Sequence, residues 1–499
     1  MRKNLMKIGF PLVLIFLFCA NLSLLNAQRD FSLIELKKPE IPVVYFKVMI
    51  KSGSADDPKG KEGLAYFTAN LLKRGTISFS RDSLDQTLDF ISANIDINVQ
   101  KDVICISGTT LKENLDKFYP LFMEVILNPN FSEEEIGKMK KDQVGAIERV
   151  KQNDAELSLE CLNNFIYQGH PYGHLTEGRV SAINSFTRED AVNFYNAHFS
   201  KNNIIAGIAG DFDEKLLERF RNDLNKLKDG VIIRQKREVH SIVGRKVLLV
   251  EKEGREQAQL RFGHPYDLTR KEKDFLPLLV LNTYLGKHRE SFGRLYRTVR
   301  EKRGLSYGAY SYVEHFEQAG WSNMQKANIP RGEQYFSMWT YPKAVNGKFT
   351  IKLVLSELSN LVTNGISQKD LDRVKNFEKN HFPFEIETPQ RKSGLMMDEE
   401  FYGTKGFLEN FEKNIDKITA DEINSSAKKY LSPDNIAIVC IVSDGEKFKE
   451  ELLSEKTEIE YPSGTDALVL KKEDEEVKGL DLKLKPEDIQ IWKVSELFR

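Results

Sequence analysis

The sequence has little cysteine and no excess of charge of either sign. Its 499 residues include four cysteines, and 73 Lys and Arg residues balance 74 Asp and Glu residues to give a net charge of -1. A chain so close to neutral offers no electrostatic attraction to nucleic acid or to an anionic membrane. Three cysteines follow the N-terminal segment, Cys105, Cys161 and Cys440. Apolar residues flank Cys105 and Cys440, so we expect structural thiols buried in strands.

Long hydrophobic runs are absent except for one near the N-terminus. Basic residues at positions 2, 3 and 7 precede an apolar run over 8–18, and small residues follow up to Ala27. This order is typical of a secretory signal peptide cleaved after Ala27. The run is short for a membrane span, so we expect an exported mature chain with no membrane span. An uncleaved anchor is the alternative.

Common catalytic signatures are also missing. The sequence has no P-loop and no Cys-x-x-Cys pair. His170 and His174 are four residues apart, but Pro171 and Gly173 break the helix that a shared metal would need at this spacing. The other histidines stand singly, and no pattern supports a metal site built from them. The residues themselves therefore indicate no metal in this chain.

One pattern of landmarks occurs twice. Asn203 and Asn435 each open an apolar strand pattern, and Ser132 and Ser367 each precede a helical pattern with acidic residues in its first turn. Both pairs are separated by a little over 230 residues. Between these landmarks, strand patterns alternate with long helical patterns at 111–127, 133–152, 349–364 and 369–379. The sequence predicts an α+β unit, an antiparallel sheet packed with helices, occurring twice.

Changes in composition suggest where these units begin and end. We expect a signal peptide at 1–27, a first half at 28–227, a charged linker at 228–245, a second half at 246–460 and a C-terminal extension at 461–499. The charge run at 471–476 in the extension is typical of a solvated loop, which we expect before a short terminal strand around 489–494.

The stretch 63–76, Gly-Leu-Ala-Tyr-Phe-Thr-Ala-Asn-Leu-Leu-Lys-Arg-Gly-Thr, predicts an apolar helix with a glycine stop. By periodicity alone it is equally well an ordinary buried helix. It resembles the Gly-Leu-Ala-His-Phe-x-Glu-His-x-x-x-x-Gly-Thr signature of the insulinase (pitrilysin) zinc peptidases, the inverzincins. Tyr66 and Asn70 stand at the two histidine positions, and Ala69 stands at the position of the glutamate base. Both zinc ligands and the base are therefore absent.

The resemblance places the family's third zinc ligand, a glutamate, near Ile147 and Glu148. The sequence does not decide which of the two matches that position. Even if Glu148 does, one carboxylate cannot hold a catalytic zinc, which takes about three protein ligands. The resemblance therefore implies degenerate zinc-site positions at Tyr66, Ala69, Asn70 and Glu148, with no metal and no catalytic residue in this chain.

Further resemblance extends over almost the whole mature chain. It is carried by motifs at 51–54, 170–173, 194–210, 281–286 and 295–307. In active relatives, an Arg and a Tyr matching Arg300 and Tyr307 face the zinc from the opposite half and hold the peptide, stabilising charge on the scissile carbonyl. The alternative is that Arg297, Arg300 and Arg303 form a solvated helix face while Tyr307 is a core strand residue.

Some members of that family consist of two different chains, one with the zinc motif and one with the Arg and Tyr, which enclose a clam-shell chamber. This chain has the second pattern. The resemblance implies a non-catalytic subunit of an exported, periplasmic, heteromeric zinc peptidase that acts on peptides, with zinc in a homologous partner. The chain would form part of the chamber wall and supply Arg300 and Tyr307 as substrate-binding residues. The alternative is a metal-free peptide-binding or scaffold protein that acts without a catalytic partner.

Overall fold

The computed structural model describes residues 31–230, 238–239 and 241–499. The predicted signal peptide at 1–27 and the middle of the predicted linker at 228–245 lie outside these residues. Within the described ranges, no helix is long and apolar enough to cross a membrane.

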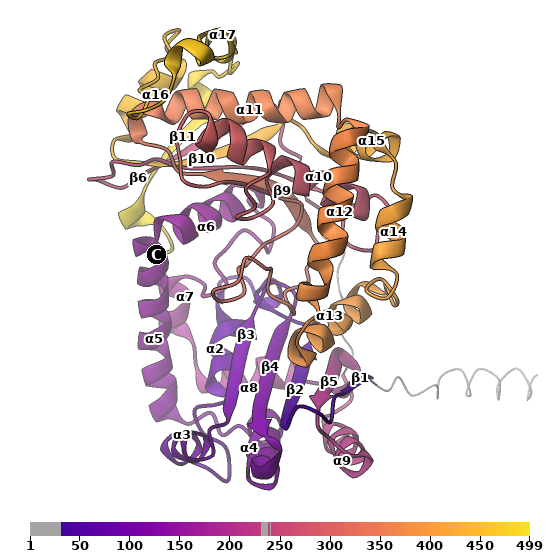
Figure 1. Ribbon diagram of the computed structural model, residues 1–499. Coiled ribbons are helices and arrows are strands. Elements are labelled where there is room, and N and C mark those ends of the chain that lie inside the picture. Colours follow the sequence, from indigo (N-terminus) through magenta and orange to yellow (C-terminus); the bar gives the residue numbers. More distant parts are fainter. Residues whose placement is uncertain (1–30, 231–237, 240) are drawn as a thin grey trace, which may run out of the picture.

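The first half is a five-stranded sheet with helices packed on it (Figure 1). The strands follow the order β1-β5-β2-β4-β3, and only β1 and β5 run parallel. The elements are β1 (Ser32–Lys37), β2 (Val43–Ile50), α2 (Leu64–Leu71), α3 (Arg81–Phe90), β3 (Asn94–Val99), β4 (Ile104–Leu111), α4 (Leu115–Leu127), α5 (Glu133–Gln152), α6 (Asp154–Ile166), α7 (Val180–Ser185), α8 (Arg188–His198), β5 (Ile204–Gly210) and α9 (Glu214–Leu224).

The second half is a six-stranded sheet in the order β11-β6-β10-β7-β9-β8. Its elements are β6 (Arg245–Glu251), β7 (Gln259–Tyr266), α10 (Phe275–Gly286), the π-helical segment η4 (Tyr296–Glu301), β8 (Ala309–Tyr312), β9 (Gln334–Thr340), α11 (Gly347–Asn364), α12 (Gln368–Glu385), α13 (Pro389–Tyr402), α14 (Phe411–Lys417), α15 (Ala420–Tyr430), β10 (Ile436–Val442), α16 (Gly445–Leu453), α17 (Ala467–Lys478) and β11 (Ile489–Lys493).

Five strands of the second sheet repeat the first sheet in order and direction. β6, β10, β7, β9 and β8 take the places of β1, β5, β2, β4 and β3, and the parallel pair β6–β10 matches β1–β5. The Ser132 and Ser367 hydroxyls cap α5 and α12 as expected, each accepting a bond from a backbone N–H three residues on. The predicted α+β fold with two similar halves is confirmed.

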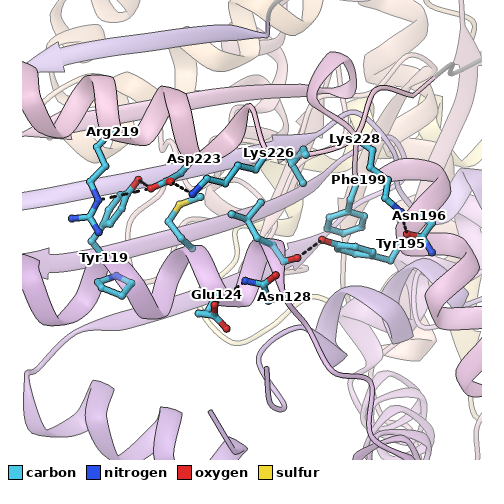
Figure 2. A pocket seen from close by; sticks show the side chains of 14 residues that line it. Tyr119, Glu124, Asn128, Tyr195, Asn196, Phe199, Arg219, Asp223, Lys226 and Lys228 are labelled. Atoms are coloured by element: carbon cyan, nitrogen blue, oxygen red, sulfur yellow. Dashed lines mark hydrogen bonds and ion pairs between the residues drawn. The ribbon is translucent and has the colours of Figure 1, made fainter. Parts of the chain in front are cut away.

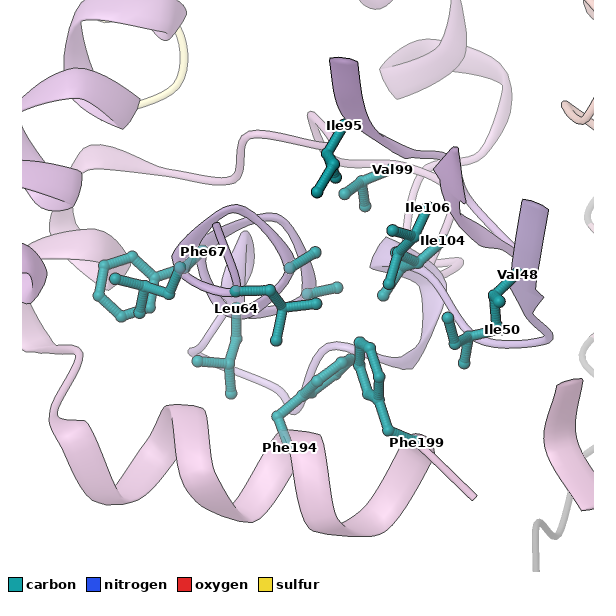
Figure 3. Close-up of a cluster of buried hydrophobic side chains, with 14 of the residues drawn as sticks. Val48, Ile50, Leu64, Phe67, Ile95, Val99, Ile104, Ile106, Phe194 and Phe199 are labelled. Atoms are coloured by element: carbon teal, nitrogen blue, oxygen red, sulfur yellow. The ribbon is translucent and has the colours of Figure 1, made fainter. Parts of the chain in front are cut away.

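The structure has two large apolar cores: one lies within the second half, and the other, which contains α2, fills the first half and extends onto β6 and β10 of the second sheet. Leu64 of α2 points toward buried side chains of the sheet and the end of α8, whereas Phe67 points to the other side of the helix (Figure 3), where its ring centroid lies 5.1 Å from that of Phe186. The helix begins after Gly63, which has φ 99°. A Cβ there would stand 2.4 Å from the carbonyl oxygen of Glu177, so this tight entry into the helix requires glycine.

Each half also sends one helix onto the sheet of the other half. α6 packs on β7 and β10, whereas α13 packs on β1, β2 and β5 (Figure 1). A buried cation anchors each crossing: Arg261 of β7 donates to Ser158 Oγ of α6 at 2.8 Å, and Lys47 of β2 donates to Asn328 Oδ1 beside α13 at 2.6 Å. The two halves are therefore interlocked rather than joined only by the linker.

The C-terminal extension differs from the solvated loop that its charge run predicted. The run lies in α17, which Asp466 caps and whose Leu470, Asp474 and Val477 face inward. Asp474 is 1% exposed because it binds the guanidinium of Arg303, which is equally buried. The composition of this segment does not show that one of its charged residues, Asp474, forms a buried ion pair, and the prediction of a solvated loop is therefore wrong. The cysteine prediction is confirmed, since Cys105, Cys161 and Cys440 are buried and unpaired.

Candidate functional site

The helix that resembles a zinc helix carries no metal-binding side chain. Ala69 is fully buried. The Asn70 amide donates to the backbone oxygen of Tyr66 at 2.9 Å, one turn earlier, so it is used within the helix. Tyr66 is half-buried, and desolvation raises its pKa, which keeps the phenol neutral. A neutral phenol, an amide and a methyl group do not fit a zinc ion.

The third-ligand candidates on α5 do not supply what α2 lacks. Ile147 is fully buried in the core. Glu148 lies on the exposed side of α5, where its carboxylate pairs with Lys151 at 2.8 Å. Among the residues that the structure describes, no group of three or more His, Cys, Asp or Glu could hold a metal ion. These positions therefore do not fit the zinc site of active insulinase-type peptidases.

Two side chains near α2 that the sequence did not single out take part in its surroundings. Gln143 of α5 donates to the carbonyl oxygens of Gly63 and Glu177 at 2.9 and 2.7 Å, which ties α5 to the start of α2. The negative charge of Glu177 contributes to the raised pKa of Tyr66, and desolvation raises the pKa of Glu177 itself to about 7. The position of Gln143 one turn before Ile147 was the only sequence signal for this contact.

The structure brings Arg300 and Tyr307 together. The guanidinium carbon of Arg300 lies 3.9 Å from the ring centroid of Tyr307 and 4.8 Å from that of Tyr296. Tyr307 is 69% exposed, so it is not the core residue of the alternative interpretation. Within the described residues, no carboxylate forms an ion pair with Arg300. The stack holds a guanidinium with free donors beside an exposed phenol, so both groups can donate hydrogen bonds to an acceptor at the surface.

The backbone between these two residues explains how they meet. Arg300 lies in the π-helical segment η4, and Gly304 then reverses the chain with φ 61°. A Cβ at Gly304 would stand 2.7 Å from Pro462 of the C-terminal extension, so glycine is needed for this close approach. The turn carries Tyr307 back over the guanidinium of Arg300.

The C-terminal extension supports this turn from behind. Arg303 donates to Asp474 Oδ1 at 2.8 Å, to Glu473 at 3.1 Å and to the backbone oxygen of Thr298 at 3.0 Å. Lys302 also pairs with Glu473, at 2.9 Å. Arg303 is therefore a buried anchor, and the interpretation of 297, 300 and 303 as one solvated face is wrong for this residue.

The other histidine candidates have structural surroundings. His170 accepts a hydrogen bond from the backbone N–H of Tyr172 at 3.1 Å. His174 is buried, contacts the backbone oxygen of Leu175 at 2.7 Å, and has a pKa lowered to about 3 by desolvation. The loop that contains them joins α6 to α7 at the boundary of the two halves.

A cavity of about 520 Å³ on the first half offers no comparable chemistry (Figure 2). None of the predicted site residues lines it. Asp223 accepts bonds from Tyr119 and Lys226 at 2.8 and 2.6 Å, and Arg219 lies 4.4 Å above the Tyr119 ring. Arg219 is also 3.8 Å from Asp223. This second Arg–Tyr stack differs from the first because a carboxylate already compensates its charge.

The sequence matches two models of one peptidase family. Residues 33–179 match "Insulinase (Peptidase family M16)", and residues 185–377 match "Peptidase M16 inactive domain". Together the two models match more than two thirds of the chain. The chain belongs to the insulinase (M16) family. The first M16 model covers the degenerate helix α2, whereas the inactive-domain model covers Arg300 and Tyr307.

Individual proteins agree with this membership. The chain is 22% identical to the "non-peptidase homolog YmxG" of Helicobacter pylori over 83% of this chain and 94% of that protein. It is 20% identical to the "uncharacterized zinc protease YmxG" of Bacillus subtilis over 82% and 95%. A crystal structure described as a peptidase M16 inactive domain from Pseudomonas fluorescens superposes with a TM-score of 0.74 at 22% identity, covering 83% of this chain and 96% of that one. That structural match supports the two-sheet M16 fold.

Proposed function

We propose that this chain is a non-catalytic subunit of an exported, heteromeric M16 zinc peptidase. It forms one half of a clam-shell chamber and presents Arg300 and Tyr307 to the zinc site of a homologous partner. The partner carries the zinc and the intact His-x-x-Glu-His helix, and the substrates are peptides or unfolded segments small enough to be enclosed. Export rests on the proposed signal peptide, and the periplasmic location rests on the resemblance to bacterial relatives.

One contrast within the chain supports this proposal. The zinc-motif positions on α2 hold side chains that do not suit a zinc ion, whereas Arg300 is stacked under an exposed tyrosine and pairs with no carboxylate of the described residues. A cation left uncompensated at a surface is suited to an anionic or polarised ligand group. The match to an inactive-domain model and the similarity to a non-peptidase homologue favour a chain without peptidase activity of its own.

A second candidate is a metal-free peptide-binding protein. β3 is an edge strand of the first sheet, and an extended peptide can add to such an edge through backbone hydrogen bonds. This candidate predicts peptide affinity in the isolated chain in the presence of a chelator, and no catalytic partner.

The deciding experiment is purification of the tagged chain from its native cell envelope. Recovery of a homologue with an intact zinc motif, together with chelator-sensitive peptide cleavage, supports the subunit proposal. In the purified complex, we expect Arg300→Ala to lower kcat/KM about a hundredfold, the usual effect of losing one charge-stabilising donor, without dissociating the subunits. Tyr307→Phe should cost less, because it keeps the ring that orients Arg300.

Arg219→Ala is the matched control. It removes another arginine stacked on a tyrosine, in the first half, and should leave peptide cleavage unchanged. Equal cleavage by the native complex and the Arg300→Ala complex would overturn the role of the pair. Recovery of the chain alone, with metal-independent peptide affinity, would favour the peptide-binding candidate.

A further inference from the structure

A cavity of about 150 Å³ lies in the second half between α10, β8, α12 and the loop that follows β8. α10 has the same place in the second half as α2 in the first, because each helix follows the strand at the centre of its sheet. α2 is surrounded by packed apolar side chains. α10 instead contributes Phe275, Leu279 and Asn282 to the wall of a cavity.

Two buried polar groups in the wall of this cavity have no partner. Asn282 Oδ1 and Ser311 Oγ form no hydrogen bond in the structure, although the residues are only 7% and 0% exposed. Gly286 of α10 lies against Ser311 of β8: a Cβ added to Gly286 would stand 3.2 Å from Ser311 Oγ. Asn282 is one turn earlier in α10, so both groups lie where α10 covers β8. Buried polar groups are nearly always hydrogen-bonded, because leaving them unpaired destabilises the fold. The lack of partners at Asn282 Oδ1 and Ser311 Oγ is explained if a bound molecule supplies the missing hydrogen bonds.

The charges around the cavity are already neutralised. Each basic side chain in the wall is paired with a carboxylate: Arg270 with Glu314, Lys287 with Glu378, Lys326 with Glu317 and Arg391 with Glu385. Burial lowers the pKa of His288, also in the wall, to about 4, so this ring is neutral at pH 7. An ionic ligand would find no free counter-charge and would lose its hydration on entry. The wall therefore suits a neutral ligand.

The rest of the wall is rich in aromatic rings. It includes Phe275, Tyr312, Phe316, Phe382, Phe407 and Phe411. A volume of about 150 Å³ is enough for a molecule the size of benzene, and the aromatic part of the wall gives such a molecule apolar surroundings. Aromatic rings pack favourably edge to face or offset against such walls.

We propose that this cavity binds a small neutral aromatic group with one hydrogen-bonding substituent, a phenol or an indole. The ring lies among the phenylalanines, and its O–H or N–H donates to Asn282 Oδ1 or Ser311 Oγ. The group is either a free small molecule or the Tyr or Trp side chain of a peptide. This proposal is independent of the proposed peptidase partner, since every wall residue belongs to this chain.

Calorimetric titration of the whole purified chain with p-cresol tests the proposal. We expect saturable binding of one molecule per chain. Toluene, which has the same ring without the hydroxyl, should bind about tenfold more weakly, because one hydrogen bond is lost. The charged analogue 4-methylbenzoate should not bind. Absence of saturable p-cresol binding at millimolar concentration would overturn the proposal, because the cavity would then hold only water.

Two variants locate the binding. Asn282→Leu replaces the amide by an apolar side chain of similar size, and Ser311→Ala removes only the hydroxyl. At least one of them should reduce p-cresol affinity to the level of toluene while leaving toluene binding unchanged or stronger. Asn196→Leu, on the first half, is the control and should bind as the native chain does. If both Asn282→Leu and Ser311→Ala bind p-cresol like the native chain, the site is not this cavity.

Competition distinguishes the two sources of the ligand. Displacement of p-cresol by N-acetyl-tyrosinamide or by a short tyrosine-containing peptide supports a peptide side chain as the occupant. Binding of p-cresol with no displacement by either compound supports a free small molecule.

Discussion

The two halves of this M16 chain share five strands in one order, and they differ mainly in the connections. In the first half, the segment between β2 and β3 forms the packed helix α2 and then α3. In the second half, the segment between β7 and β8 forms α10, the π-helical segment η4 and the turn that brings Arg300 to Tyr307. The duplicated sheets therefore act as a common frame. The residues that distinguish the two halves lie in the segments that connect the strands of these sheets.

The frame itself retains one matched pair of buried cations. Lys47 of β2 lies opposite Gly207 of β5, and Arg261 of β7 lies opposite Val439 of β10, which are corresponding positions in the two sheets. Each cation bonds at the helix that crosses from the other half. The same device thus fixes both crossings, although the partners differ: Asp398 stands near Lys47, whereas Arg261 meets a serine hydroxyl and a backbone oxygen.

The C-terminal extension is present in the second half only, and Arg303→Ala would remove the buried ion pair that attaches it to the turn after η4. This change leaves the carboxylate of Asp474 buried without its partner, so we expect the free energy of unfolding to fall by about 3–5 kcal/mol. Urea unfolding followed by circular dichroism measures the loss. Arg300→Ala, three residues earlier in the chain, should affect stability much less, because the Arg300 side chain stacks on Tyr296 and the exposed Tyr307 and forms no ion pair with a described residue.

Lys302→Ala is the matched control for Arg303→Ala. It removes a cation that pairs with Glu473 from the same extension, but this pair is about half exposed. Exposed ion pairs contribute about 0–1 kcal/mol, so the variant should unfold close to the native chain. A loss as small for Arg303→Ala would show that the extension is only loosely attached.

Stability at the α13 crossing should depend on pH, because this crossing contains the carboxyl of Asp398, which is only 2% exposed. Desolvation raises the pKa of Asp398 to about 6 in the folded chain, whereas an unfolded aspartate titrates near about 4. The folded state therefore binds the proton more tightly, and stability is lost as pH rises from about 4 to about 6. Relative to Asp398→Asn, the native chain should lose roughly 2–3 kcal/mol of unfolding free energy between pH 4 and pH 7.

Ser158→Ala tests the corresponding crossing. It removes the hydroxyl that Arg261 contacts at 2.8 Å and introduces no titratable group. We expect a loss of about 1–2 kcal/mol that stays the same from pH 4 to pH 7. Urea unfolding of the three proteins at both pH values is the measurement. A native-minus-Asp398→Asn difference that does not change with pH would contradict the raised pKa.

The frame was readable from the sequence because its signals are local and repeated. Ser132 and Ser367, and Asn203 and Asn435, mark corresponding elements, and the apolar runs at β5 and β10 are buried throughout. The crossings of α6 and α13 were not readable. An amphipathic helix shows which face is apolar, but it does not show whether that face covers its own sheet or the neighbouring one.

The candidate site was partly readable. The sequence pointed to Arg300 and Tyr307, and the structure places them 3.9 Å apart; their substrate-binding role stays a prediction. The sequence alone showed that both histidine ligands, at 66 and 70, and the glutamate base, at 69, are absent. The burial of Arg303 against Asp474 could not be foreseen, because the two residues are far apart in sequence and lie among exposed charges. Asn282 and Ser311 became notable only once their lack of partners was known.

The smallest expected effect sharpens the comparison at one matched detail. Thr187 and Thr419 cap α8 and α15, the helices that precede β5 and β10. In each case, the threonine hydroxyl accepts a hydrogen bond from a backbone N–H, at 3.1 and 3.2 Å, and an acidic side chain accepts one from the threonine N–H, at 2.8 Å.

Replacing either threonine by alanine should lower the free energy of unfolding by about 1 kcal/mol, and the double variant should lower it by about twice that, since the caps lie in separate halves. Thr87→Ala, inside α3, should change the free energy of unfolding by less than about 0.5 kcal/mol. If the two variants lose clearly different amounts of unfolding free energy, the two caps contribute differently to stability in spite of their similar geometry.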